Sequence, residues 1–448
     1  MGSRGAELRH EASAAALVVF GYAAACGLAV ALGFDHVSDD DYARVTIAQA
    51  FAHRPRLDPS GTSWLPLPFW TLGSILAVFG RSLAVARGAS IALASLAAVL
   101  PYLALRSTGS TRPRALAGLA FAMLSPWSVW LGAATVPESF TASATAAAAI
   151  ALGATGGPHV GVSARARIGF ALALLAACLS RYEPWPVAAV LAIVLAARAR
   201  KERSVASLVS ALVVAAGPIL WMAWNLHAHG DALHFFARVS RFKRALGEGT
   251  TDGVAALLLY PRLLVTTRPD VVLAFTCALA GARAFLVPAE VRARWLVPIA
   301  CGAAQIVFLA YGNARDGAPA HHAERALLGA TFILAAFSAD VVVEAAAFAR
   351  SRARGAAIGA GVLIMGAWAI TTVRAAADVP GSGAAEDRAP QIRRGKALRA
   401  EGAGGLVITP CAYEHFALIA AYGAPEEVEA RPSTGVPIIP ACPAVERR

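Results

Sequence analysis

The chain has 448 residues, of which 57% are hydrophobic and 15% are charged, and its formal net charge is +12. An ordinary soluble enzyme carries about 25% charged residues and a disordered chain has low hydrophobicity, so this composition excludes both classes. A nucleic-acid-binding protein concentrates its cations on one soluble face. Here most arginines stand in short bursts between apolar stretches, as topology signals do. The composition therefore indicates a polytopic membrane protein without a nucleic-acid partner.

Eleven apolar stretches of spanning or near-spanning length follow one another along the chain. A helix needs about 20 residues to cross the hydrocarbon, so 166–180 and 184–197 are short for a complete crossing. The first stretch exceeds the apolar part of a signal peptide, which favours a retained helix. The predicted spans lie at about 14–34, 84–105, 115–132, 137–155, 166–180, 184–197, 204–226, 270–288, 295–311, 325–344 and 356–374.

The charges of the short loops predict the orientation of these spans. With the N-terminus in the cytoplasm, the short inner segments carry sixteen lysine and arginine residues, whereas the short outer loops carry only Arg181 and Arg315. Because cationic short loops stay inside, this difference predicts a cytoplasmic N-terminus and an extracytoplasmic C-terminus. Counting 64–80 as a further span would move the arginine-rich 106–114 loop outside. We therefore expect an interfacial or re-entrant helix at 64–80.

The remaining segments divide the chain into a transmembrane part, 1–374, and a small extracytoplasmic C-terminal region, 375–448. The transmembrane part has two long outer loops, at 35–83 and 227–269. Strand-like runs at 405–409 and 436–439 favour an appended fold in the C-terminal region. Its two cysteines, Cys411 and Cys442, could form a disulfide in an oxidising compartment. The many alanines of the spans are interpreted as a compositional bias.

Acidic residues form the first candidate site, at Asp39-Asp40-Asp41 directly after the first span. Adjacent carboxylates cannot share a helix face, and crowding raises their pKa, which suits a general base or a cation ligand. The same aspartates could instead cap the helix expected at 42–53. Glu138, at the outer start of the fourth span, is a further catalytic candidate, although the helix dipole alone also favours a carboxylate there.

Cationic candidates lie in three outer segments. Arg181 and Glu183 separate two short apolar stretches, where the simplest interpretation is that they pair with each other. His322 and Arg325 enter the tenth span from outside, and the adjacent His321 and His322 lack the spacing of a metal site. The second long outer loop holds four cations within seven residues, which favour an anionic headgroup or form a solvated surface: Arg238, Arg241, Lys243 and Arg244.

In this order, these segments resemble the C-type membrane glycosyltransferases, and among them the protein O-mannosyltransferase and lipid A aminoarabinose transferase group. The resemblance covers about residues 12–345. Relatives often have Asp-Glu and His-Pro-Pro where this chain has Asp-Asp-Asp and Leu-Pro-Leu-Pro, which leaves the choice among the aspartates open. The motifs are Asp40-Asp41 before Ile47-Ala48, Trp64-Leu65-Pro66-Leu67-Pro68, Gly80-Arg81, Ala86-Arg87, Leu124-Ser125-Pro126 before Glu138, Arg181-Tyr182-Glu183, and Arg325.

The resemblance implies an all-α polytopic enzyme in a bacterial inner (plasma) membrane. It would transfer a sugar from a polyprenyl-phosphate donor to a lipid, glycan or protein acceptor at the outer face. Asp40, ahead of Asp41, would be the general base, and cations would hold the departing phosphate. Metal dependence stays open, because some relatives bind a divalent cation, for which Asp39 to Asp41 and Glu138 have suitable oxygen atoms.

The alternative function is a transporter or flippase of lipid-linked saccharides, which could share a cationic outer pocket. A transporter of this kind typically has polar residues near the centres of its spans and internal repeats. The centres of the predicted spans are mostly alanine, leucine, valine and glycine, and no repeat is visible. The sequence therefore favours the transferase.

Overall fold

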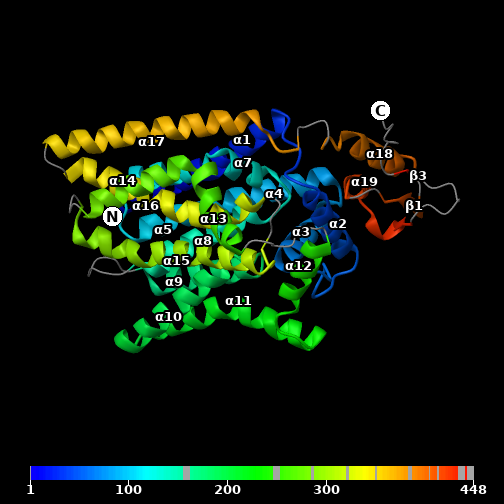
Figure 1. Cartoon of the computed structure of the whole chain (residues 1–448), viewed down its shortest axis with the longest axis horizontal. Helices are drawn as coiled ribbons and strands as arrows, with labels where there is room; N and C mark the ends of the chain where they lie inside the picture. Colours follow the sequence, from blue (N-terminus) through cyan, green and yellow to red (C-terminus); the bar gives the residue numbers. More distant parts are fainter. Residues whose placement is uncertain are drawn as a thin grey trace.

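A computed structural model of the chain places nearly all of its regular structure in helices, most of them running along one common direction (Figure 1). The structure describes residues 2–154, 162–245, 253–283, 287–318, 322–348, 351–381, 386–402, 404–410, 413–431 and 439–440. The first half contains α1 (Gly2–Ala31), α2 (Asp40–His53), α3 (Leu67–Phe79), α4 (Leu83–Ala97), α5 (Val99–Ser107), α6 (Arg112–Met123), α7 (Pro126–Ala133), α8 (Glu138–Gly153), α9 (Ala164–Cys178) and α10 (Trp185–Glu202). The second half contains α11 (Val205–His229), α12 (His234–Ala245), α13 (Gly253–Thr267), α14 (Pro269–Arg283), α15 (Ala289–Ala314), a 3₁₀ turn (Ala323–Leu327), α16 (Leu328–Phe348), α17 (Ser351–Ala377), α18 (Ala389–Ala400) and α19 (His415–Tyr422).

Among the described residues, six helices are long and apolar enough to cross a membrane, and eight if each of two bent pairs is one span. The predicted all-α polytopic membrane fold is confirmed, whereas the count of about eleven spans is not. α8 and α9 have 16 and 15 residues and fall short of a full crossing. The six helices are Arg9–Ala31, Leu83–Ser107, Val205–His229, Ala289–Ala314, Ala323–Ala347 and Arg354–Ala377.

Two pairs of consecutive helices meet at sharp angles where a proline begins the second helix. The predicted span 115–132 consists of α6 and α7, which meet at an angle of 77° where Pro126 begins α7. α13 and α14 meet at 93°, with Pro269 as the first residue of α14. Proline lacks the N–H that would continue the preceding helix, so it starts a new helix instead. The predicted outer loop 227–269 is therefore largely helical and contains α12 and α13.

The segments predicted to be cytoplasmic lie together at one end of the bundle. Glu11 of α1 forms ion pairs with Arg106 at 2.8 Å and with Arg112 at 2.7 Å. Arg294 donates a hydrogen bond to the carbonyl of Thr108 at 3.2 Å. At the opposite end, on the right of Figure 1, lie α2, α3, α12 and the C-terminal elements. Segments grouped by loop charge are thus also grouped in space.

The orientation of this bundle in the membrane can be tested with reporters. We expect a reporter fused after Arg448 to be active only on the outer side, because the cationic loops should hold the opposite end in the cytoplasm. The measurement pairs an outside-active enzyme with an inside-fluorescent protein at the same position. Cytoplasmic fluorescence from that fusion would mean that a span has been miscounted.

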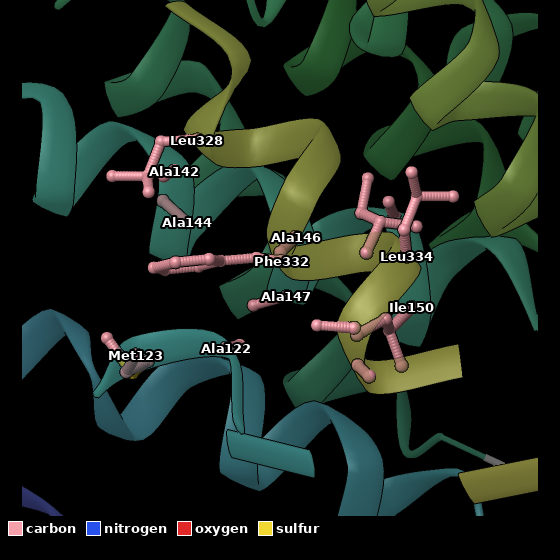
Figure 2. Close-up of a cluster of buried hydrophobic side chains, with 14 of the residues drawn as sticks. Ala122, Met123, Ala142, Ala144, Ala146, Ala147, Ile150, Leu328, Phe332 and Leu334 are labelled. Atoms are coloured by element: carbon pink, nitrogen blue, oxygen red, sulfur yellow. The ribbon is translucent and has the colours of Figure 1, made fainter. Parts of the chain in front are cut away.

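The alanines of α8 allow the helices at the centre of the bundle to approach closely. Every residue of α8 except Phe140 is buried. Figure 2 shows Phe332 of α16 lying among Ala144, Ala146 and Ala147 of α8. Lipid tails are as apolar as leucine, so helices in membranes associate mainly through close contact of small residues. The interpretation of the alanines as a mere compositional bias is wrong for this helix.

The two shorter outer elements match the expectations in part. α3, within the predicted interfacial segment 64–80, has 13 residues and is too short to span. The C-terminal region contains a parallel three-stranded sheet of order β2-β1-β3, with β1 (Leu406–Thr409), β2 (Val428–Ala430) and β3 (Ile439–Pro440). β1 coincides with the predicted run 405–409, whereas 436–438 and the cysteines Cys411 and Cys442 lie outside the described residues.

Candidate active site

A buried cluster of ion pairs forms from three distant parts of the chain, at the end of the bundle predicted to face outward. Glu138 is the first residue of α8, Arg181 lies in the turn between α9 and α10, and Arg325 lies in the 3₁₀ turn before α16. One carboxylate oxygen of Glu138, Oε1, lies 2.5 Å from Nη1 of Arg181 and 3.9 Å from Nη1 of Arg325. Arg181 also donates from Nε to Glu183 Oε1 at 2.9 Å, so the predicted Arg181–Glu183 pair is confirmed.

The Arg181 guanidinium stays charged although it lies in a buried cluster. Burial lowers the pKa of the Arg181 guanidinium, but the carboxylates of Glu138 and Glu183 outweigh it and raise that pKa above its usual range. A buried charge is tolerated only when it is paired, and breaking such a pair usually destabilises the protein. The cluster is therefore a permanent polar centre in an apolar protein, which is typical of a functional site in a membrane.

The three aspartates at the start of α2 point to different partners. Asp40 is the most exposed, with 42% of its side chain accessible, and its Oδ2 lies 3.4 Å from Nη2 of Arg325. Asp41 is buried, and its Oδ2 accepts a hydrogen bond from the Ser38 N–H at 3.2 Å. Asp39 occupies the N-cap position but makes no side-chain cap hydrogen bond. Among the three aspartates, Asp41 therefore takes the capping role. Its carboxylate accepts a hydrogen bond from a backbone N–H three residues earlier, as the acidic residue of a capping box does.

Burial raises the pKa of Asp41 to about 6, because its effect is larger than that of His36 and Arg325, which lower the same pKa. Its second oxygen, Oδ1, is buried without a hydrogen-bond partner. The folded protein thus holds the Asp41 proton more tightly than the unfolded chain, where the pKa is near 3.8. Protonation of Asp41 therefore adds stability that is complete below about pH 4 and is lost as the pH rises through about 6.

This linkage predicts how the melting temperature changes with pH. Between pH 4 and pH 7 the melting temperature of the wild-type protein should fall relative to that of Asp41→Asn, because asparagine does not titrate. Thermal unfolding in detergent at several pH values measures the difference between the two proteins. Two parallel curves over this range would show that Asp41 does not titrate there.

Arg44 of α2 belongs to the same site and was missed by the sequence analysis. Its guanidinium lies 4.4 Å from the ring centroid of Trp64, it is buried, and its Nε has no hydrogen-bond partner. Arg44 forms no ion pair with any described residue, and burial lowers its pKa. Positions three or four apart share a helix face, so the spacing of Asp40 and Asp41 from Arg44 could have indicated it.

An apolar cavity opens beside this cluster, between α2, α3, α4 and α8. Its empty volume is about 620 Å³, including the part open to solvent. Arg44 and Ser180 supply polar groups, while most of the wall is apolar. The wall residues are Leu67, Pro68, Phe69, Thr71, Leu72, Ser90, Leu93, Ala94, Thr135, Val136, Pro137 and Phe140. An apolar cavity with a buried cation suits an amphiphilic anion.

A smaller polar pocket, with an empty volume of about 220 Å³, is lined by the ion-paired cluster itself. Glu138, Arg181, Glu183 and Arg325 line it. Three further buried oxygen atoms of its lining have no hydrogen-bond partner: Glu138 Oε2, Thr141 Oγ1 and Gln305 Oε1. Buried polar atoms are normally bonded, so these atoms are available to the hydroxyl groups of a bound molecule.

The structure does not bring the cations of α12 into this cluster. Arg238 donates to the carbonyl of Gly61 at 2.7 Å, and Lys243 donates to Asn313 Oδ1 at 2.9 Å. Arg241 and Arg244 are exposed and donate to carbonyls of their own helix. His322 contacts the ring of Trp127 and lies 3.7 Å from Glu324, and His321 lies outside the described residues. The four α12 cations thus lie apart from the carboxylates of the cluster.

The donor set of the cluster does not fit a divalent metal. Asp40 and Glu138 are already paired with arginines, which compete for the same oxygen atoms. Within the described ranges, no group of three or more histidine, cysteine or acidic side chains is arranged to hold a metal ion. Calcium requires 6–8 oxygen ligands, and magnesium near-ideal octahedral geometry.

Comparison with known proteins identifies the fold. No protein-family model matches the chain, and no curated protein matches it in sequence. The chain is similar to the crystal structure of ArnT from Cupriavidus metallidurans bound to undecaprenyl phosphate, with a TM-score of 0.56 and 14% identity. The match covers 95% of this chain and 89% of that chain. The chain has the ArnT fold. The likeness to ArnT agrees with the resemblance that the sequence motifs indicated.

Proposed function

We propose that the chain transfers a sugar from a polyprenyl-phosphate donor to an acceptor at the outer face of a bacterial inner membrane. The observation that carries this proposal is the buried cluster of Glu138, Arg181 and Arg325 beside Asp40, next to an apolar cavity that contains Arg44. A lipid phosphate needs an apolar channel that ends at fixed cations, and a sugar acceptor needs a base. The structure with the same fold was solved with undecaprenyl phosphate, which supports this class of donor.

Asp40 is proposed as the general base. It is the most accessible of the three aspartates, and its carboxylate lies 3.4 Å from the Arg325 guanidinium. The acceptor hydroxyl or amine would give its proton to Asp40 while its heteroatom bonds to the anomeric carbon. The bond from that carbon to the phosphate oxygen breaks, and the polyprenyl phosphate departs with the electron pair. Base and phosphate therefore lie on opposite sides of the sugar.

Arg44 is proposed as the main ligand of the departing phosphate. Arg181 and Arg325 share their charge with Glu138, Glu183 and Asp40, whereas Arg44 forms no ion pair with a described residue. A guanidinium in a water-poor site binds phosphate strongly and through two parallel hydrogen bonds. The unpartnered oxygens of the polar pocket would accept hydrogen bonds from the sugar.

A transporter of lipid-linked saccharides is less compatible with this arrangement. Such a protein binds its substrate near the middle of the membrane, between mobile halves. Here the charged cluster lies near one end of the bundle, and packed alanines and Phe332 fill the space between α8 and α16 (Figure 2). The closed middle favours chemistry at one surface over passage through the bundle.

Turnover of a labelled donor by the purified protein tests the proposal. We would incubate the protein in lipid nanodiscs with a panel of polyprenyl-phosphate-linked pentoses and hexoses and separate the free polyprenyl phosphate by chromatography. The expected result is acceptor-dependent release of polyprenyl phosphate. Flipping of an intact donor between leaflets of a vesicle, without cleavage of any member of the panel, would support the transporter instead.

A further inference from the structure

The C-terminal region packs directly on the helix that carries the aspartates. Ala417 and Ala420 of α19 belong to one buried apolar cluster with Tyr42, Val45 and Ala48 of α2. Polar contacts also join the two parts, because Gln49 donates from Nε2 to the carbonyl of Ala420 at 2.8 Å. The region is thus attached to α2 by both apolar packing and hydrogen bonds.

One arginine of this region reaches the acidic segment itself. Arg388, at the N-cap of α18, donates from Nε to Asp39 Oδ1 at 2.8 Å and from Nη2 to Asp39 Oδ2 at 3.0 Å. Arg388 is buried, and its Nη1 also lies 3.6 Å from Glu414 Oε1 of the same region. Two parallel bonds between a planar guanidinium and a carboxylate fix both distance and angle. A fork of this kind positions its partner more strictly than a single ion pair does.

A second contact brings the same region against the loop before α2. Gly381 has a positive φ of 71°, and a Cβ atom there would lie 2.3 Å from the carbonyl oxygen of His36. Only glycine allows the chain to pass so close to His36 in this conformation. The loop from His36 to Asp41 is therefore covered by Gly381 and held by Arg388, two points of the same C-terminal region.

Among the residues that the structure describes, none makes a close side-chain bond that would fix the direction of the Asp40 carboxylate. Its ion pair with Arg325 is long, at 3.4 Å, and its side chain is partly accessible. The direction of its carboxylate therefore depends on the backbone of the first turn of α2, which follows the N-cap residue Asp39. The carboxylate of Asp39 makes no cap bond within α2 and is bonded to Arg388 instead.

We propose that Arg388 is a positioning residue for the transfer reaction: through its fork on Asp39, the C-terminal region holds the first turn of α2 so that Asp40 faces the acceptor. This inference rests on the proposed function. It gives the C-terminal region a part in the reaction, through the orientation of a base that it does not touch.

The test compares Arg388→Ala with a matched control in the same interface. Glu426 of the C-terminal region pairs with Arg81 at 2.6 Å, so Glu426→Gln also removes an ion pair between the region and the rest of the chain, but not one to the aspartates. We expect Arg388→Ala to lower kcat by roughly 10- to 100-fold, because small displacements of a reacting group have effects of this size. The donor KM should change less than about twofold, and Glu426→Gln should leave kcat within about twofold.

Two further variants separate positioning from general attachment. Arg388→Lys keeps the charge but not the fork, so its kcat should lie between those of wild type and Arg388→Ala. The double variant Asp39→Asn/Arg388→Ala should be no slower than the slower single variant, since both changes remove one interaction. Equal kcat for Arg388→Ala and Glu426→Gln would overturn the proposal, as would a raised donor KM in Arg388→Ala, which would place the arginine on the donor side.

Amide hydrogen exchange distinguishes a failure of this inference from a failure of the proposed function. Exchange in the segment 36–46 should be faster in Arg388→Ala than in wild type or Glu426→Gln, whether or not a donor has been found. Unchanged exchange would overturn the positioning role. Exchange could be faster in Arg388→Ala while the wild-type protein cleaves no donor of the panel. That result would overturn the proposed function and the catalytic half of the inference, and would leave only the structural contact between Arg388 and Asp39.

Discussion

Asp40→Asn is expected to fold normally and to lower turnover by about 10²–10⁴-fold, the usual contribution of a general base. Asparagine has the shape of aspartate but cannot take the acceptor proton. The side chain is partly accessible and its ion pair with Arg325 is long, so the substitution removes little packing and only a weak contact. Single-turnover transfer from a labelled lipid donor measures the loss.

Asp41→Asn is the matched variant for this experiment, because the two residues are adjacent and differ in burial. Asp41 is buried and reaches back to the Ser38 N–H, so its replacement should change stability more than turnover. Binding of polyprenyl phosphate should survive in Asp40→Asn, since the base faces the acceptor. Near-normal transfer by both variants would exclude the acidic segment as the source of the base and reopen the transporter as the function.

Arg44→Gln is expected to raise the donor KM by about 10- to 100-fold. A hydrogen bond to a charged group contributes about 1.5–3 kcal/mol, and 1.4 kcal/mol corresponds to a factor of ten. Glutamine is used because it removes the charge and keeps much of the side-chain volume beside Trp64. Arg44→Lys should recover part of the affinity, since it restores a cation without the planar fork.

The donor KM also decides whether the lipid phosphate binds at Arg44 or at the cations of α12. Alanine at each α12 cation tests the alternative site, because Arg238, Arg241, Lys243 and Arg244 lie apart from the carboxylate cluster. Arg374→Ala, an exposed arginine of α17, serves as the control for the loss of one cation. A normal donor KM in Arg44→Gln together with a raised KM in any α12 variant would move the phosphate to α12.

The sequence alone determined the properties that depend on single segments. Hydropathy showed that the chain spans a membrane with many helices, and loop charges grouped the segments that meet at each end, as the contacts of Glu11 confirm. It also indicated that three adjacent aspartates must diverge and that Arg181 and Glu183 pair. Each of these follows from the composition of one stretch or from residues a few positions apart, so no knowledge of packing was needed.

Only the tertiary structure decided which of the charged residues form one site. Glu138, Arg181 and Arg325 meet because α8, α10 and α16 begin at the same place, and their order in the chain contains no information about the distances between them. The same packing places Arg44 at a cavity and keeps the α12 cations apart from the cluster. It also brings Arg388 into contact with Asp39, some 350 positions away in the chain. The role of the alanines of α8 also became clear only from the packing, because a small side chain is an advantage only where a neighbouring helix packs closely against it.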